Sequence, residues 1–145
     1  MILNTLIVIF TFFFMEFVAW FAHKYVMHGF LWFLHKDHHQ VDHNKKFQKN
    51  DYFFLIFAIP SILCFVYGAE NYSYLFFIGI GIVLYGLAYF IIHEIIIHRR
   101  LPPPSKTKNK YIIAIRKAHK IHHKNRNKEH CINFGMLIVS RKYFK

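Results

Sequence analysis

The sequence predicts an all-α fold, an integral membrane bundle with about three transmembrane helices. The first observation is a conflict in composition: the chain of 145 residues is 55% apolar and 20% aromatic, yet its net charge is +12. The conflict disappears if the apolar residues lie in lipid and the charges are segregated outside it. The second observation is that three long apolar runs alternate with basic segments. The length of the chain favours a single domain, residues 1–145.

The first apolar run predicts a transmembrane helix over about residues 2–22. As a helix its 21 residues rise about 31 Å, which is enough for the hydrocarbon core of a bilayer. Glu16 lies within this run, and an ionisable residue at membrane depth is a functional candidate by default. A structural polar contact between helices is the alternative role for Glu16.

Two further apolar runs predict transmembrane helices over about residues 52–68 and 72–92. A turn, Gly68-Ala69-Glu70-Asn71, separates these two runs. Three successive prolines, Pro102 to Pro104, then end any helix that follows the third run.

Residues 99–145 form a basic tail with fourteen Lys or Arg and one acid, Glu129. Within this tail, Ile112 to His123 has the pattern of an amphipathic helix. The apolar patch from Phe134 to Val139 is too short to cross a bilayer. We expect that patch to lie at the membrane interface or to pack against the helical stems.

The basic residues also predict the orientation of the spans. Segment 24–50 holds five lysines and the tail holds fourteen basic residues, whereas the N-terminus and the 68–72 turn hold none. Because Lys and Arg concentrate on the cytoplasmic side of membrane proteins, both basic segments are expected there. The protein is therefore expected in the cytoplasmic membrane with its N-terminus outside.

Ten of the twelve histidines follow a spacing that the chain uses twice, an H-x-x-x-x-H pair followed by an H-x-x-H-H box. Imidazole is a common ligand of Zn, Cu, Fe and Ni. Ten rings exceed the roughly four to six ligands of one metal ion, so the pattern predicts a histidine-lined site for two ions on the cytoplasmic side. The predicted ligands are His23, His28, His35, His38, His39, His93, His98, His119, His122 and His123.

The two spacings place their rings differently on a helix. Residues three and four apart share a face, so each H-x-x-H-H box is expected to aim three imidazoles at a common point. Five residues turn a regular helix by about 500°, which leaves the rings of an H-x-x-x-x-H pair about 140° apart. Such a pair either divides its rings between two ions or lies where the helix end unwinds. His43 and His130 fall outside the pattern and are expected to be loop residues.

Carboxylates near the boxes are candidates for orienting a ligand ring through its second N–H. Glu16 precedes His23 by two helical turns, so it would lie deeper on the same face and support the site without being a ligand. No catalytic residue separate from the metal ligands is predicted. The other candidate acids, for which a solvated carboxylate is the equal alternative, are Asp37, Asp42, Asp51 and Glu94.

A metal site at the mouth of a membrane bundle is accessible to a lipid-soluble substrate and to a water-borne reductant. Two redox-active irons could there activate O2 and attack an unactivated C–H bond. A zinc peptidase is excluded, because the segment from His93 to His98 has one residue too many for the H-E-x-x-H motif. A metal carrier is disfavoured because its ligands would be distributed across the bilayer. Topology and anionic lipid explain the basic tail better than nucleic-acid binding does.

The four boxes resemble those of the membrane fatty acid hydroxylase superfamily. More narrowly, Ala22-His23-Lys24-Tyr25-Val26-Met27-His28-Gly29-Phe30, followed by Trp32 and Phe47-x-x-Asn50-Asp51, is similar to the bacterial β-carotene 3-hydroxylases. Ala118-His119-x-x-His122-His123 and Cys131-x-x-Phe134-Gly135 resemble the same family. The similarity runs from about residue 5 to 140. One departure is His93-Glu94-Ile95-Ile96-Ile97-His98, where the family commonly reads H-D-G-L-V-H.

The resemblance implies a non-haem di-iron monooxygenase that hydroxylates the β-ionone rings of β-carotene at C3, giving β-cryptoxanthin and then zeaxanthin. It further implies two iron ions as cofactors, O2 as co-substrate and electrons from a ferredoxin-type donor. The expected partners are therefore a carotenoid, membrane lipid and that donor, without nucleic acid. The alternatives are a carotenoid ketolase and a hydroxylase or desaturase of a fatty acyl chain or sterol. A non-catalytic membrane metal-binding protein is the more remote alternative.

Overall fold

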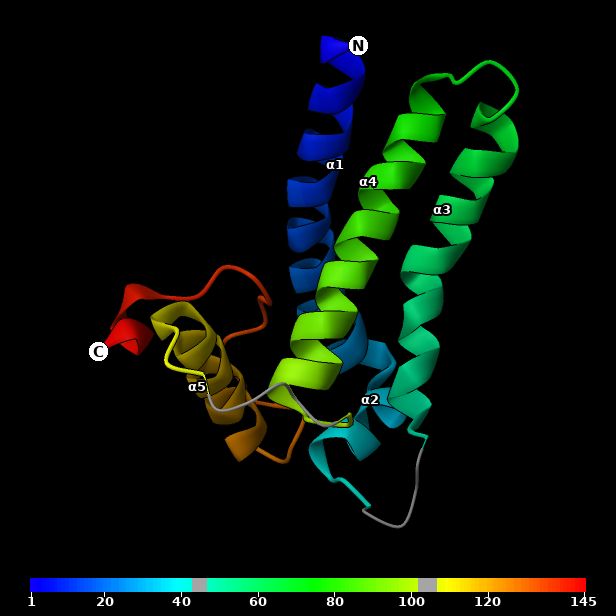
Figure 1. Cartoon of the computed structure of the whole chain (residues 1–145). Coiled ribbons are helices and arrows are strands. Elements are labelled where there is room, and N and C mark those ends of the chain that lie inside the picture. The colour runs from blue at the N-terminus through cyan, green and yellow to red at the C-terminus, as the bar shows by residue number, and fades with distance from the viewer. Residues whose placement is uncertain (43–46, 102–106) are drawn as a thin grey trace.

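The computed structural model describes residues 1–42, 47–101 and 107–145, and every regular element in these ranges is a helix. Three helices run side by side, and the other helices gather at one end of them (Figure 1). The predicted all-α fold is therefore confirmed. The three side-by-side helices are α1 (Ile2–Phe21), α3 (Leu55–Gly68) and α4 (Tyr74–Tyr89).

Helix α4 lies between α1 and α3 and contacts both of them (Figure 1). On one side, Met15 and Ala19 of α1 pack with Ile82 and Tyr85 of α4 in the largest buried apolar cluster of the described chain. Tyr85 is fully buried in this α1–α4 contact.

Two glycines of α4 let its neighbours approach closely. A Cβ at Gly81 would lie 2.6 Å from Cβ of Thr11 on α1, and one at Gly79 would lie 3.0 Å from the Phe65 ring on α3. The hydroxyl of Ser61 also donates to the carbonyl of Gly79 at 3.4 Å. Lipid provides little hydrophobic drive between helices, so close backbone packing of this kind holds membrane bundles together.

The outer surface of the bundle is strongly apolar. Phe10 is 72% exposed and Phe13 is 64% exposed on α1, as expected of side chains that face lipid. Three helical stretches are long and apolar enough to cross a membrane, namely Ile2–Phe30, Lys49–Gly68 and Tyr74–Ile97. The chain is therefore a membrane protein. The first and third stretches end well beyond the predicted residues 22 and 92 because π-helices extend α1 and α4.

These two π-helices are η1 (Ala22–Phe30) and η3 (Phe90–Ile97). The N–H of Leu31 donates to the carbonyl of Val26 at 3.0 Å, and the N–H of His98 donates to the carbonyl of His93 at 2.9 Å. Both hydrogen bonds span five residues, one more than in an α-helix. Helical geometry is interrupted at Gly29, and α2 (Trp32–His39) follows. π-Helical turns are often found at functional sites.

The other helices lie at the same end of the bundle as the π-helices (Figure 1). Asn109 caps helix α5 (Lys110–Lys124) by accepting the backbone N–H groups of Tyr111 and Ile112. Ala114 and Ala118 of that helix then pack against Tyr143. The amphipathic helix predicted for residues 112–123 is thus present. The elements are η2 (Lys49–Phe54), α5 (Lys110–Lys124) and η4 (Arg141–Phe144).

The segment between α5 and η4, residues 125–140, runs back over the end of the bundle. Asn133 fixes its middle by donating to the carbonyl of Ala118 at 3.2 Å and by pairing with the Tyr143 hydroxyl. Leu137 packs against the buried cluster between α1 and α4. Of the two locations expected for the 134–139 patch, the structure therefore shows packing against the helical stems.

Candidate metal centre

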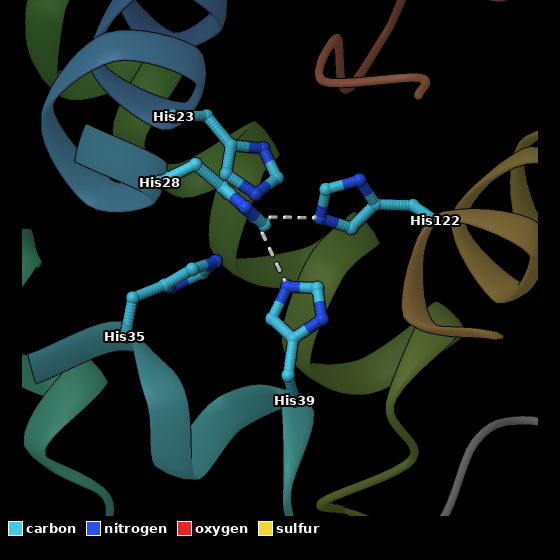
Figure 2. A group of neighbouring side chains, drawn as sticks. All are labelled: His23, His28, His35, His39 and His122. Carbon is cyan, nitrogen blue, oxygen red and sulfur yellow. Dashed lines mark hydrogen bonds between the residues drawn. The ribbon is translucent and has the colours of Figure 1, made fainter. Parts of the chain in front are cut away.

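The ten histidines of the repeated pattern come together in two neighbouring groups. In the first histidine group the ligand nitrogens lie within 4.8 Å of one another, and the rings come from η1, α2 and α5 (Figure 2). It consists of His23, His28, His35, His39 and His122. The second histidine group consists of His38, His98, His119 and His123, together with His93, whose Nε2 lies 3.2 Å from that of His98.

The two π-helices keep each H-x-x-x-x-H pair on one face. In a helix whose hydrogen bonds span five residues, side chains five apart lie above one another. The ring centroids of His23 and His28 are accordingly 5.2 Å apart, and both rings belong to the first group. His93 and His98 both lie at the second group. Of the two alternatives for these pairs, the structure therefore shows the departure from regular helix and not a division between ions.

The expectation that each H-x-x-H-H box aims three rings at a common point was wrong. Each box divides its rings between the two groups and does not aim three at one point. On α2, His35 and His39 face the first group while His38 faces the second. Residues four apart differ by about 40° around a helix, whereas the residue three along lies about 60° to the other side. Helix α5 divides its box in the opposite sense, so that α2 and α5 both lie between the groups and join them.

Backbone carbonyls hold most rings of the first group. The acceptors for Nδ1–H are the carbonyls of Phe134 for His23 (3.0 Å), Lys128 for His28 (3.1 Å), Asn125 for His39 (3.0 Å) and Ile132 for His122 (2.8 Å). His35 donates instead to the Asn50 side-chain oxygen at 2.6 Å. A carbonyl oxygen only accepts, so these contacts place the proton on Nδ1 and leave Nε2 with a lone pair.

Side chains hold two rings of the second group in the same way. His38 donates Nδ1–H to the amide oxygen of Gln48 at 2.9 Å, and His93 donates to a carboxylate oxygen of Glu94 at 2.6 Å. The other Glu94 oxygen pairs with Arg100 at 2.9 Å, and Arg100 also pairs with Asp51 at 2.7 Å. A carboxylate on the far nitrogen of a ring fixes its orientation and raises its basicity as a ligand.

The candidate acids thus have different roles. Glu94 orients a ring directly, as the sequence suggested, whereas Asp51 touches Arg100 and the Gln48 backbone. Asp37 accepts the backbone N–H groups at the start of η2, at 2.6 and 3.4 Å. Asp42 lies in the exposed segment after α2.

Facing nitrogens in the first group show what the site can hold. Nε2 of His28 lies 3.1 Å from Nε2 of His39 and 3.2 Å from Nε2 of His122 (Figure 2). With the protons on Nδ1, no hydrogen is available between these atoms, and their lone pairs repel. Within the described ranges, the buried Nε2 atoms of His23 and His35 also have no hydrogen-bond partner. A cation that accepts these lone pairs removes both costs, so the donor set fits metal ions.

Burial keeps the rings in the form that binds metal. It lowers the pKa of His39 to about 4 and the pKa values of His98 and His122 to about 3, with neighbouring imidazoles adding to the shift. These rings are therefore neutral at pH 7, and neutral imidazole is the ligand form.

Glu16 lies away from the rings and anchors the C-terminal segment. One of its oxygens accepts the backbone N–H groups of Met136 (2.8 Å), Leu137 (2.8 Å) and Ile138 (3.1 Å), and the other accepts the Tyr85 hydroxyl (2.8 Å). The structure thus shows a polar contact between segments. Because the same segment supplies four carbonyls to the first group, Glu16 also supports that group through the backbone.

Sequence reasoning missed Gln48, Asn50 and the four carbonyls. The carbonyls leave no trace in a sequence, because any residue offers one, whereas Asn50 lies in the Phe47-x-x-Asn50-Asp51 motif that marked the resemblance. His130 is exposed and outside both groups, as expected of a loop residue. His43 lies outside the described residues.

A family model described as fatty acid hydroxylase matches residues 8–141. The chain belongs to the fatty acid hydroxylase family. The β-carotene hydroxylase of Pantoea ananas is 40% identical over 134 residues, which cover 92% of this chain and 76% of that protein. The β-carotene hydroxylase of Pseudescherichia vulneris is 37% identical over 98% of this chain and 80% of its own length.

A third relative, the β-carotene hydroxylase of Paracoccus sp. (strain PC1), is 36% identical over 91% of this chain and 82% of its own length. No solved structure matches the chain at a significant level. Membership of the fatty acid hydroxylase family, together with the two histidine groups, indicates a metal-dependent oxygenase.

Proposed function

We propose that this chain is a membrane-bound β-carotene hydroxylase that oxygenates C3 of the β-ionone rings, giving β-cryptoxanthin and then zeaxanthin. The observation that carries the proposal is the convergence of ten imidazoles at one end of a lipid-facing bundle. Relatives similar along almost the whole chain are β-carotene hydroxylases, which supports this substrate.

Two iron ions are the proposed cofactors, one held by the Nε2 atoms of each histidine group. When bound, the ions supply the activation of O2 that hydroxylation of an unactivated C–H bond needs. The chain's own contribution is to place the rings. The Nδ1 acceptors fix the orientation of at least seven imidazoles before any ion binds.

Charge is the second contribution of the chain. Neutral nitrogen ligands leave the positive charge of bound ions uncompensated, so nearby acids matter to the centre. Glu94 places a carboxylate on His93, 2.6 Å from its Nδ1, and thereby brings negative charge to the second group. Burial of the rings limits the access of water to both groups.

The metal end of the bundle is proposed to face the cytoplasm, where a ferredoxin-type donor delivers electrons. Charge asymmetry supports this orientation, because all nineteen Lys and Arg lie in segment 24–50 and the 99–145 tail. A basic face raises the association rate of an acidic donor, and salt screens the attraction over about 8 Å at physiological ionic strength. Turnover at limiting ferredoxin should therefore fall with added salt. Salt-independent turnover would leave the charge as a topology signal alone.

Expression in β-carotene-producing cells tests the reaction. We expect β-cryptoxanthin and zeaxanthin on chromatography, with the new oxygen derived from 18O2 and not from water. Cells that express the His39→Ala variant provide the matched background, because one ring of the first group is missing. Unchanged β-carotene accompanied by hydroxylated fatty acyl chains or sterols would reject this substrate in favour of another lipid.

A further inference from the structure

A cavity of about 700 Å³ lies beside α3 and α4 and reaches the histidine-bearing end of the bundle. Most of its wall is apolar, with Phe57 and Phe65 of α3 opposite Leu87 of α4 and Phe90 of η3. Apart from Ser61 of α3, the polar residues of the lining come from η2, from η3 and from the residues just after η3. They are Asn50, Asp51, Glu94 and Arg100.

The polar lining is in direct contact with both histidine groups. Asn50 accepts Nδ1–H of His35 in the first group, and Glu94 accepts Nδ1–H of His93 in the second, each at 2.6 Å. The cavity therefore extends from the apolar helices to residues that are one hydrogen bond from the predicted metal ligands.

Gly86 lines this cavity and has no packing reason to be a glycine. A Cβ added at Gly86 would meet nothing within 4 Å, whereas at Gly79 and Gly81 it would lie within 3.0 Å or less of a neighbouring helix. Gly86 also has no positive φ that would exclude a side chain. Glycine inside a helix is destabilising relative to alanine. What the glycine provides is space in the cavity.

We propose that the cavity binds one β-ionone ring and the adjoining polyene of the substrate, and that Gly86 sets its clearance as a specificity-determining residue. This inference rests on the proposed function. Cavities of roughly 300–1,000 Å³ hold ligands of that size. The apolar wall suits a hydrocarbon, and the remainder of the polyene would lie toward lipid. The polar lining beside the histidines suits the ring that receives a hydroxyl group.

A graded series, Gly86→Ala, Gly86→Val and Gly86→Leu, tests the assignment. Product formation should fall with side-chain size, by at least about tenfold for leucine, because the added bulk takes up space that the substrate needs. The amount of β-carotene retained by the purified protein, read from its visible absorbance, should fall in parallel. Iron content should stay at the wild-type level and thermal stability at or above it, because the added side chain favours helix.

Leu84→Phe is the matched control. Leu84 is 44% exposed on the same helix and lies outside the cavity lining, so extra bulk there should change neither turnover nor retained carotenoid. If Gly86→Leu behaves like Leu84→Phe while the wild type hydroxylates β-carotene, the cavity assignment is wrong and the function stands. If the wild type does not hydroxylate β-carotene, the proposed function is wrong, and the amount of retained β-carotene tests the cavity assignment by itself. Loss of retained β-carotene in Gly86→Leu supports the assignment. The assignment is wrong if Gly86→Leu retains as much β-carotene as the wild type, or if the wild type retains none.

Discussion

The two histidine groups use the same ligand type but differ in what holds their rings. Four of the five rings in the first group donate to backbone carbonyls of one segment, residues 125–134. In the second group, the acceptors for His38 and His93 are the side chains of Gln48 and Glu94. The first group therefore depends on the path of the backbone, and the second on the identity of particular side chains.

The difference also concerns charge. The described acceptors of the first group are carbonyl and amide oxygens, which are neutral, whereas Glu94 brings a carboxylate to the second. A carboxylate acceptor makes an imidazole a stronger donor to metal than a carbonyl does. Two ions of the same element would therefore be inequivalent in this protein.

Removal of a ligand ring should have the largest effect on either group. His39→Ala and His123→Ala should each remove an ion from their own group and lower hydroxylation by at least about a hundredfold, since both the ligand and its geometry are lost. Iron analysis and product formation measure the outcome. His130→Ala is the control, because His130 is exposed and outside both groups. An equally damaging His130→Ala would contradict the assignment by spacing.

Displacement of the C-terminal segment should damage the first group before the second. Glu16→Leu leaves three backbone N–H groups without their acceptor, at a cost of about 1–3 kcal/mol each when buried. We expect a lower melting temperature and selective loss of first-group iron, resolved by Mössbauer spectroscopy.

Tyr85→Phe is the matched variant for Glu16→Leu. It removes a single hydrogen bond to Glu16 and keeps the buried ring, so its cost should be about 1 kcal/mol. Equal iron loss from both groups in Glu16→Leu would show that the segment does not support the first group in particular.

Changing the charge of the Nδ1 acceptors should change the difference in metal affinity between the two histidine groups. Glu94→Gln retains an oxygen near His93 but removes its charge, so metal affinity of the second group should fall by about 10- to 100-fold. Asn50→Asp places a carboxylate on His35 and should strengthen the first group. Metal titration of both variants measures the change. If neither substitution changes the metal affinity, the charge of the acceptor does not determine how strongly the rings bind metal.

The bundle and the convergence of the ten histidines were predictable because both depend on local sequence. Hydropathy located the three spans, and repeated spacing selected the ten rings that converge. The spacing of the H-x-x-x-x-H pairs partly indicated the π-helices, because an interval of five residues fits hydrogen bonds that span five residues.

The division of rings between the groups was not predictable from spacing. His35, His38 and His39 lie close enough on one face of α2 to suggest a common ion. Only the position of α5 opposite them places His38 in the second group and the other two rings in the first. The carbonyl acceptors depend on how the 125–134 segment folds back, which no residue type in that segment reveals. Glu16 was recognised as unusual, but its partners are 69 to 122 residues away in sequence.

The smallest expected effect distinguishes the two partners of Glu94. Arg100 pairs with both Glu94 and Asp51, but its side chain is 28% exposed, and such ion pairs contribute only about 0–1 kcal/mol. Arg100→Gln should therefore reduce the metal affinity of the second group by less than about fivefold. A reduction as large as that in Glu94→Gln would mean that Glu94 acts by holding Arg100 across the polar lining of the cavity. A small reduction means that Glu94 acts on His93, through the contact that brings a carboxylate to the second group.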